Sequence, residues 1–194
     1  MARSAAIFVD RDDTLMVDMK YCADPDLVKL IPGAAEGLRA LREAGYRVVV
    51  VTNQSGIGRG YFDGETLSRV NNRLRDELRR EGADYDALYY CPHTPEDDCG
   101  CRKPKPGLLL RAASELEIDL ASSYTLGDRN LDVEAGRAAG TKTILVSRTS
   151  IPANGGSDPA ADFVAPSLAD AAKLILTGSK SPDGRAGSRI RLRS

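Results

Sequence analysis

The stretch AAIFVDRDDTLMVD, residues 5–18, joins an apolar run directly to a cluster of carboxylates. The apolar residues at its start predict a strand over 5–10 that is buried on both faces. Asp10, Asp12 and Asp13 then follow within four positions. Carboxylates this close repel one another, and burial makes that repulsion more costly. The stretch therefore indicates either a solvated acidic turn or a site built around a cation.

The composition sets limits on the class of protein. A chain of 194 residues with 42% apolar residues suits one α/β domain with at most a small appendage. The formal net charge of -1 gives no bias toward nucleic acid or a membrane surface. The sequence contains no run of about 18 apolar residues, and acidic residues follow the N-terminus too soon for a secretory signal. These features predict a cytoplasmic protein.

Predicted strands and helices alternate along the chain. The patterns predict strands over 5–10, 46–53, 86–92, 123–128, 142–147 and 161–164, and helices over 32–45, 64–82, 105–118, 130–140 and 167–176. Such alternation predicts a three-layer α/β fold, with helices on both faces of a mostly parallel sheet. We expect one domain over 1–177, a loop over 149–160, and a flexible Gly/Ser/Arg-rich tail over 178–194.

Polar residues follow several of the predicted strands. In parallel α/β sheets the ligand site lies at the carboxyl ends of the strands. Asp10, Thr52 and Asp128 each stand at such an end, so we expect them to converge. Two carboxylates two residues apart, Asp10 and Asp12, can share phosphoryl-transfer chemistry: one attacks phosphorus and the other handles a proton. Mg²⁺ would relieve their repulsion.

The segment VTNQSG supplies hydroxyls, amides and backbone N–H groups after the second strand. Thr52, Asn53, Gln54 and Ser55 could form a phosphate cradle, or a polar turn with a helix cap.

Two further segments carry charged candidates. In CRKPKPG, Lys103 can act as a point charge on the transferring group and Arg102 can grip another oxygen-rich part of the substrate, although an exposed basic loop has the same composition. In LGDRNLD, Asp128 can hold the cation. Asp132 can do the same, or cap a helix.

The segment CPHTPEDDCGC contains three of the four cysteines and the only histidine. A disulfide between Cys99 and Cys101 would be strained, and a reducing compartment disfavours a disulfide framework. The four side chains can instead close a tetrahedral, structural zinc site, free surface thiols being the alternative; the ligands are Cys91, His93, Cys99 and Cys101. Such a site would orient the two basic residues that follow it. Cys22 is predicted to be an ordinary thiol.

The order DRDDT, TNQSG, RKPKPG, GDRNLD over about residues 5–147 resembles the four motifs of haloacid dehalogenase (HAD) phosphatases. The resemblance implies that Asp10 is the nucleophile, forming an aspartyl-phosphate, and that Asp12 is the general acid/base. It implies that Thr52 and Lys103 stabilise the phosphoryl group. Asp128 would bind Mg²⁺ together with Asp10 and Asp12.

The predicted zinc loop ahead of RKP resembles the loop of one subgroup of HAD phosphatases. Members of that subgroup act on heptose 1,7-bisphosphate or histidinol phosphate and lack a large cap domain. TNQSG, CRKPKPG and DMKYC resemble the heptose branch more. That branch implies Mg²⁺-dependent removal of the C7 phosphate of D-glycero-D-manno-heptose 1,7-bisphosphate, for the activated heptose of lipopolysaccharide and other surface glycans. The implied substrate contacts are Asp18, Met19, Lys20, Tyr21, Thr52, Asn53, Gln54, Ser55, Arg102, Lys103 and Arg129.

Two other functions stay open on the sequence: a phosphatase for histidinol phosphate or another small sugar phosphate, and a zinc-stapled binding module without chemistry. The intact set of Asp10, Asp12, Lys103 and Asp128 argues against the binding module, because a binder needs no nucleophile. With no apolar seam evident, we expect a monomer whose partner is a small sugar bisphosphate.

Many relatives have glycine where this chain has Asp13. A third carboxylate could increase the demand for a cation, point to solvent or cap the following turn. We expect an Asp13→Gly variant to keep its turnover.

Overall fold

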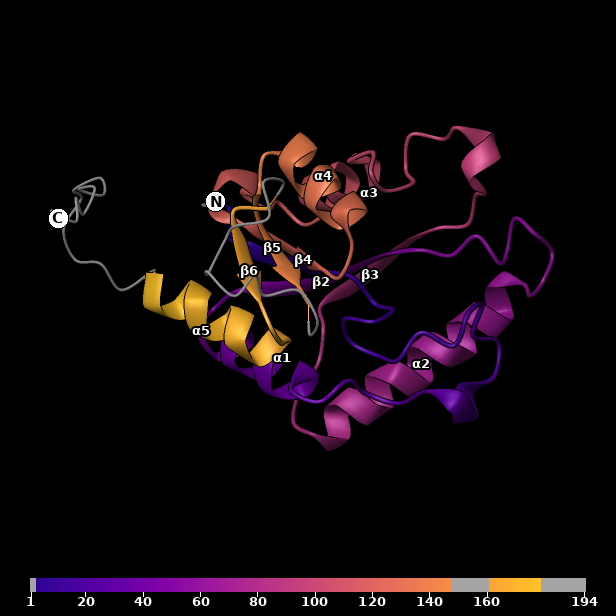
Figure 1. Ribbon diagram of the computed structural model, residues 1–194, viewed down its shortest axis with the longest axis horizontal. Helices are drawn as coiled ribbons and strands as arrows, with labels where there is room; N and C mark the ends of the chain where they lie inside the picture. The colour runs from indigo at the N-terminus through magenta and orange to yellow at the C-terminus, as the bar shows by residue number, and fades with distance from the viewer. Residues whose placement is uncertain (1–2, 148–160, 179–194) are drawn as a thin grey trace, which may run out of the picture.

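The computed structural model describes residues 3–147 and 161–178 and contains one six-stranded parallel sheet (Figure 1). The strand order is β3-β2-β1-β4-β5-β6, with every neighbouring pair parallel. The strands are β1 (Ala6–Val9), β2 (Arg47–Asn53), β3 (Ala87–Cys91), β4 (Tyr124–Gly127), β5 (Lys142–Val146) and β6 (Phe163–Ala165). The predicted alternation and the three-layer architecture are confirmed.

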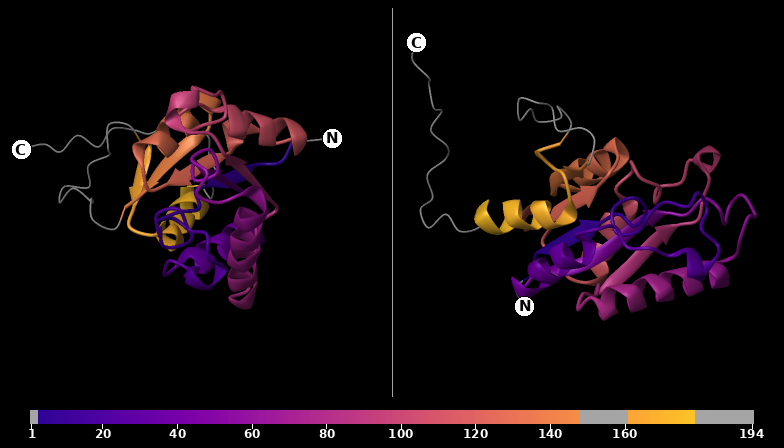
Figure 2. Two further views of the ribbon diagram at one scale, coloured as in Figure 1. Left: turned by 90° about the vertical axis from the view of Figure 1, so that its right-hand side faces the viewer. Right: turned by 60° about the horizontal axis from the view of Figure 1, so that its bottom comes forward.

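Helices cover both faces of the sheet, as Figures 1 and 2 show. The helices α1, α2 and α5 share one hydrophobic cluster with inward side chains of β1 and β2, and α3 and α4 share a second cluster on the opposite face. Their bounds are α1 (Ala34–Glu43), α2 (Gly64–Arg80), α3 (Gly107–Glu115), α4 (Asn130–Ala139) and α5 (Leu168–Gly178), with short 3₁₀ turns at Pro25–Leu27, Pro95–Asp97 and Leu120–Ser122.

The centre of the sheet positions the candidate site. All four residues of β1 are fully buried, and Phe8 lies opposite Val49 of β2 and Thr125 of β4. This parallel register brings the carboxyl ends of β1, β2 and β4 to one edge of the sheet. Asp10, Thr52 and Asp128 therefore gather there, as predicted.

The first and third helices differ most from their predicted ranges. The first helix begins at Ala34 rather than Pro32, because Gly33 precedes it in the left-handed region with φ 83°. The third helix is shorter at both ends than the predicted 105–118: it begins at Gly107 and ends at Glu115. Glu117 is in the left-handed region, with φ 53°, and a residue there cannot continue a right-handed helix.

No cap domain interrupts the described part of the chain. The segment between β1 and α1, which contains Asp10, Asp12 and Asp13, has only a short 3₁₀ turn that packs against α2. No helix in the described ranges has the length and apolar character to cross a bilayer. The loop predicted over 149–160 and, apart from Gly178 at the end of α5, the tail predicted over 178–194 lie outside the described residues.

Candidate active site

Three carboxylates meet at the carboxyl edge of the sheet. Asp10 follows β1, Asp128 follows β4 and Asp132 lies in the first turn of α4; an oxygen of each lies within 4.8 Å of the others. Gly127 makes this approach possible, because a Cβ there would overlap the Asp132 carboxylate. Asp132 also accepts a hydrogen bond from the Arg129 N–H at 3.2 Å, so it caps α4 and belongs to the cluster.

Lys103 contacts two carboxylates of this cluster, and Arg129 Nε lies 3.5 Å from the third, at Asp128 Oδ2. Lys103 Nζ lies 2.8 Å from Asp10 Oδ1 and 2.5 Å from Asp132 Oδ1, and it donates to the Val51 carbonyl at 2.8 Å. The side chain of Lys103 is only 3% exposed. A buried ammonium held between two carboxylates has a fixed position, which suits a group that must meet one oxygen of a substrate.

Burial and mutual repulsion shift the pKa values of the cluster. Burial raises the pKa of Asp10 to about 7; Lys103 opposes the shift, while Asp132 and Asp12 add to it. Burial and the charge of Asp10 raise the pKa of Asp128 to about 6. Burial by itself lowers the pKa of Lys103, but Asp10 and Asp132 outweigh it and raise that pKa above its ordinary value. The raised pKa values of Asp10 and Asp128 show that Lys103 and Arg129 leave the three carboxylates incompletely compensated.

The donor set fits a magnesium ion. Carboxylate oxygens are the protein ligands that Mg²⁺ prefers. Asp128 Oδ1 is buried and has no hydrogen-bond partner among the described residues, which is costly for a charged oxygen unless a ligand approaches it. Asp10 and Asp128 could therefore hold Mg²⁺, with Asp132 beside them.

Asp12 lies apart from the carboxylate group that could hold a metal. Arg11 Nη2 contacts its Oδ1 at 2.9 Å, while Gln54 Nε2 and Thr52 Oγ1 donate to its Oδ2 at 2.8 and 3.3 Å. The structure thus places the Asp12 side chain with Thr52 and Gln54 rather than with the predicted metal ligands Asp10 and Asp128. Arg11 is itself 1% exposed and donates to Asn71 Oδ1 of α2 at 2.8 Å.

The last residue of β2, Asn53, contacts the segment that carries Lys103. Asn53 Nδ2 donates to the Lys103 carbonyl and Asn53 Oδ1 accepts from the Lys103 N–H, both at 3.1 Å. This reciprocal pair fixes the backbone of Lys103 against the end of β2.

A cavity of about 380 Å³ opens above these residues. Its lining contains all the predicted substrate contacts except Met19, whose side chain is exposed; the lining residues are Asp10, Arg11, Asp12, Asp18, Lys20, Tyr21, Thr52, Asn53, Gln54, Ser55, Arg102, Lys103, Arg129 and Leu131. Asp128 lines a neighbouring cavity of about 240 Å³ together with Asp13. Apart from Met19 and Asp128, the predicted catalytic and substrate-contact residues therefore line one cavity.

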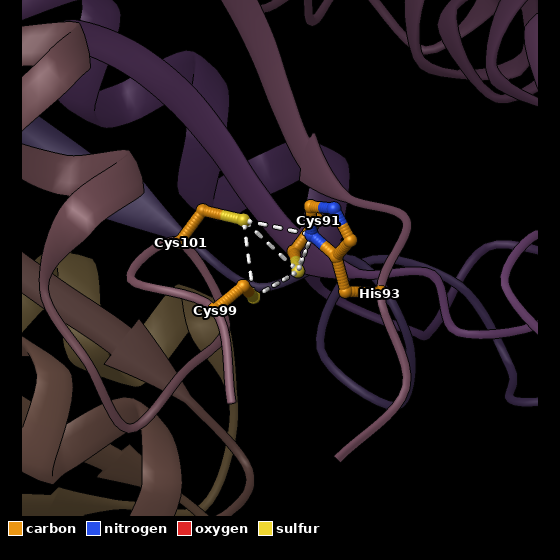
Figure 3. Close-up of side chains that lie close together, drawn as sticks. All are labelled: Cys91, His93, Cys99 and Cys101. Atoms are coloured by element: carbon orange, nitrogen blue, oxygen red, sulfur yellow. Dashed lines mark hydrogen bonds between the residues drawn. The ribbon is translucent and has the colours of Figure 1, made fainter. Parts of the chain in front are cut away.

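The four side chains of the cysteine–histidine cluster lie next to one another in space, as Figure 3 shows. Sγ–Sγ distances are 3.2 Å for Cys91–Cys101, 3.4 Å for Cys99–Cys101 and 3.5 Å for Cys91–Cys99. His93 Nδ1 lies 3.3 Å from Cys101 Sγ and 3.5 Å from Cys91 Sγ. Tetrahedral zinc with Zn–S bonds of about 2.3 Å separates its sulfurs by about 3.8 Å, so the four side chains fit a zinc ion.

This cluster contacts Arg102, which lines the cavity described above. Arg102 Nη1 donates to the His93 carbonyl at 3.2 Å, and Arg102 directly follows Cys101 in the chain. Burial raises the pKa of Cys91 to about 12, so a cation is needed before this thiol becomes a ligand. A metal bound here would hold the loop that positions Arg102 and Lys103.

The sequence did not predict Arg11, Asn71 or the cavity-lining Leu131, and it left the role of Asp132 open. Arg11 and Asn71 were not predicted, since their pairing depends on how α2 packs beneath the first motif. Asp132 stood as either a cap or a cation ligand, and the structure gives it a cap and an ion pair. Its spacing of four residues from Asp128, at the start of a helix, was the available signal.

The sequence of this chain is similar to those of known proteins. A family model described as "HAD-hyrolase-like" matches residues 100–171. D-glycero-beta-D-manno-heptose-1,7-bisphosphate 7-phosphatase of Pasteurella multocida is 42% identical over 176 residues, covering 88% of this chain and 96% of the relative. The enzyme of the same name from Escherichia coli K12 is 41% identical over 188 residues, covering 93% and 98%.

A solved structure is similar over nearly the whole chain. The D,D-heptose 1.7-bisphosphate phosphatase of B. bronchiseptica, complexed with magnesium and phosphate, superposes with a TM-score of 0.79 at 34% identity, covering 90% of this chain and 99% of that one. The chain therefore belongs to the HAD superfamily and, within it, to the family of the heptose-1,7-bisphosphate 7-phosphatases.

Proposed function

We propose that this protein is a Mg²⁺-dependent phosphatase that removes the C7 phosphate of D-glycero-D-manno-heptose 1,7-bisphosphate. The observation that carries the proposal is the contact of buried Asp10 with Lys103 on the floor of a cavity, with Asp128 beside them. Relatives at 41–42% identity are named for this reaction. The product would supply the activated heptose of surface glycans such as the lipopolysaccharide core.

Asp10 is the nucleophile of the proposed reaction. A carboxylate oxygen attacks phosphorus, the bond from phosphorus to the C7 oxygen breaks, and an aspartyl-phosphate forms. Lys103 is already fixed against Asp10 and lies ready to stabilise charge on the phosphoryl oxygens. Thr52 and the backbone N–H of Asn53 lie around the same cavity and would donate to the phosphoryl group, whereas the Gln54 N–H already donates to the Cys91 carbonyl at 2.7 Å.

Asp12 is the general acid/base. Protonated Asp12 gives its proton to the departing C7 oxygen, and the resulting carboxylate then takes a proton from the water that hydrolyses the aspartyl-phosphate. Arg11, Thr52 and Gln54 fix the side chain for both steps.

The two metals have separate proposed roles. Mg²⁺, held by Asp10 and Asp128, neutralises carboxylate and phosphate charge when bound. Cys91, His93, Cys99 and Cys101 would hold Zn²⁺, whose role would be structural because four protein ligands leave no open position. The bound magnesium and phosphate of the B. bronchiseptica enzyme support the first role, and the fit of the thiol cluster supports the second.

The substrate is tested by phosphate release. Purified protein with MgCl₂ is expected to hydrolyse heptose 1,7-bisphosphate with a kcat/KM at least about tenfold above that for histidinol phosphate, because a site built for one set of hydroxyls loses hydrogen bonds with the other substrate. Chelation of Mg²⁺ is expected to abolish release. Equal or reversed preference would contradict the heptose assignment, and no Mg²⁺-dependent release from any phosphomonoester would contradict the enzyme.

Two expectations complete the proposal. We infer a monomer acting in the cytoplasm on a small sugar bisphosphate. Sedimentation at the concentration of the assay tests the oligomeric state, with a single species of about 20.8 kDa expected from the mass of the chain.

A further inference from the structure

Asp13 stands in the first motif but takes no place in the carboxylate group that could hold a metal. Its backbone lies in the left-handed region, with φ 55°, where aspartate is tolerated better than most residues. Its N–H donates to the Met16 carbonyl at 2.8 Å, and its Oδ1 accepts a hydrogen bond from the Asp18 N–H at 3.1 Å. Of the three roles open to Asp13 on the sequence, the structure favours capping of the turn.

The Asp18 side chain contacts Lys20 and Arg129 in turn. Its Oδ1 accepts from the Lys20 N–H at 2.8 Å, and its Oδ2 lies 3.5 Å from Arg129 Nη2. Lys20 and Tyr21 follow with φ values of 47° and 63°, which are unfavourable for side chains of their size. A segment with two such residues needs contacts that hold it, and Asp13 supplies one of them to the segment's first residue.

The held segment, residues 18–21, forms one wall of the cavity. Asp18, Lys20 and Tyr21 all line it, whereas Asp10 and Lys103 line its floor, where phosphorus would react. The Tyr21 ring packs edge-on against Tyr61, with the ring centroids 4.8 Å apart. This wall therefore faces the part of a substrate that lies beyond the reacting phosphate.

We propose that Asp13 is a positioning residue that fixes the wall of residues 18–21 through its hydrogen bond to Asp18, and thereby sets the affinity for the sugar portion of the substrate. The proposal rests on the proposed function for the identity of that portion. In this proposal Asp13 touches no reacting atom, so loss of the Asp13 side chain leaves the rate of the chemical step unchanged.

A second account of Asp13 is electrostatic. Its carboxylate contributes to the raised pKa values of Asp128 and Arg129, so it could act by charge on the metal site. Asp13→Asn separates the two accounts, because asparagine keeps an acceptor oxygen and tolerates the left-handed backbone but carries no charge. Asp13→Gly frees the backbone and Asp13→Ala strains it, and both lack the acceptor.

The kinetic test measures KM and kcat of the four proteins on heptose 1,7-bisphosphate and on para-nitrophenyl phosphate, which has no sugar. Loss of a hydrogen bond of ordinary strength is expected to raise the KM for the bisphosphate about fivefold in Asp13→Gly and Asp13→Ala. The kcat is expected to stay within about twofold, the aryl phosphate to be unaffected, and Asp13→Asn to match the wild type. If Asp13→Asn behaves like Asp13→Gly, or if the KM for both substrates rises equally, the proposal is overturned.

Amide hydrogen exchange at Asp18 provides a readout without substrate. Protection is expected in the wild type and in Asp13→Asn, and faster exchange in Asp13→Gly; equal exchange in all three contradicts the hydrogen bond. Absence of wild-type turnover on the bisphosphate contradicts the proposed function and the inference together. Normal wild-type turnover with an unchanged KM in Asp13→Gly contradicts the inference alone.

Discussion

Burial and Lys103 shift the pKa of Asp10 in opposite directions, and Asp132 and Asp12 add to the effect of burial. Burial favours the neutral form of Asp10, and Lys103 favours the carboxylate that a nucleophile must be. The resulting pKa of about 7 is that of Asp10 when no metal ion is bound. A divalent cation beside Asp10 and Asp128 would tip it toward the reactive carboxylate.

The same balance makes stability depend on pH and magnesium together. Asp10 and Asp128 have pKa values raised from 3.8 to about 7 and about 6. The folded metal-free protein therefore binds more protons than the unfolded chain, and this contribution to stability is lost as the pH rises from about 4 to about 7. The increase in Tm caused by Mg²⁺ is expected to be small near pH 5 and larger near pH 8. Differential scanning fluorimetry at matched ionic strength measures it, and an equal increase at both pH values would count against the site.

Replacing either motif carboxylate tests the division of labour. Asp10→Asn removes the proposed nucleophilic oxygen and is expected to lower kcat by about a thousandfold or more. Asp12→Asn removes the proposed proton donor and is expected to lower kcat by about a hundredfold. Glu134→Gln, on the exposed face of α4, is the matched control and should keep full activity. Both active-site variants should remain folded by circular dichroism. Wild-type turnover in Asp10→Asn would refute the assignment.

At the scale of elements, the end of β4 and the start of α4 act as one unit. Gly127 leaves the space into which the Asp132 carboxylate fits, and Asp132 in turn holds Lys103. A Gly127→Ala substitution forces Asp132 away and is expected to lower kcat at least about tenfold, since a displacement of about 1 Å in an active site has large effects. Gly64→Ala, at the start of α2 where a Cβ has room, should be neutral. A Gly127→Ala enzyme with normal kcat would show that the contact is dispensable.

The thiol cluster makes the loop between β3 and α3 a second such unit. Loss of one ligand is expected to lower the zinc content well below one ion per chain. Cys99→Ser should also lower the Tm, and turnover with it, because the loop carries Arg102 and Lys103. The Cys22→Ser variant is changed outside the cluster, so its zinc content should equal that of the wild type. Zinc content by atomic emission and Tm on the same samples check the prediction; full activity in a zinc-free Cys99→Ser enzyme would rule out the orienting role.

At the scale of the whole molecule, the sequence predicted the sheet and the meeting of Asp10, Thr52 and Asp128, because β-branched apolar runs and a parallel arrangement leave few alternatives. The Arg11–Asn71 contact was not predictable, since it depends on where α2 crosses the loop after β1. The separation of Asp12 from the carboxylate group that could hold a metal likewise depends on side-chain directions, and the spacing of residues in the sequence does not give these. Exact helix ends were missed where a left-handed residue intervenes, as at Gly33.

The most direct test is a crystal structure of the protein with MgCl₂ and beryllofluoride, a mimic of a phosphoryl group. Beryllium is expected to be bonded to a carboxylate oxygen of Asp10, with Lys103 contacting a fluoride and the magnesium ion ligated by Asp128. Beryllofluoride bonded to another side chain, or bound in the cavity without a bond to Asp10, would contradict the account.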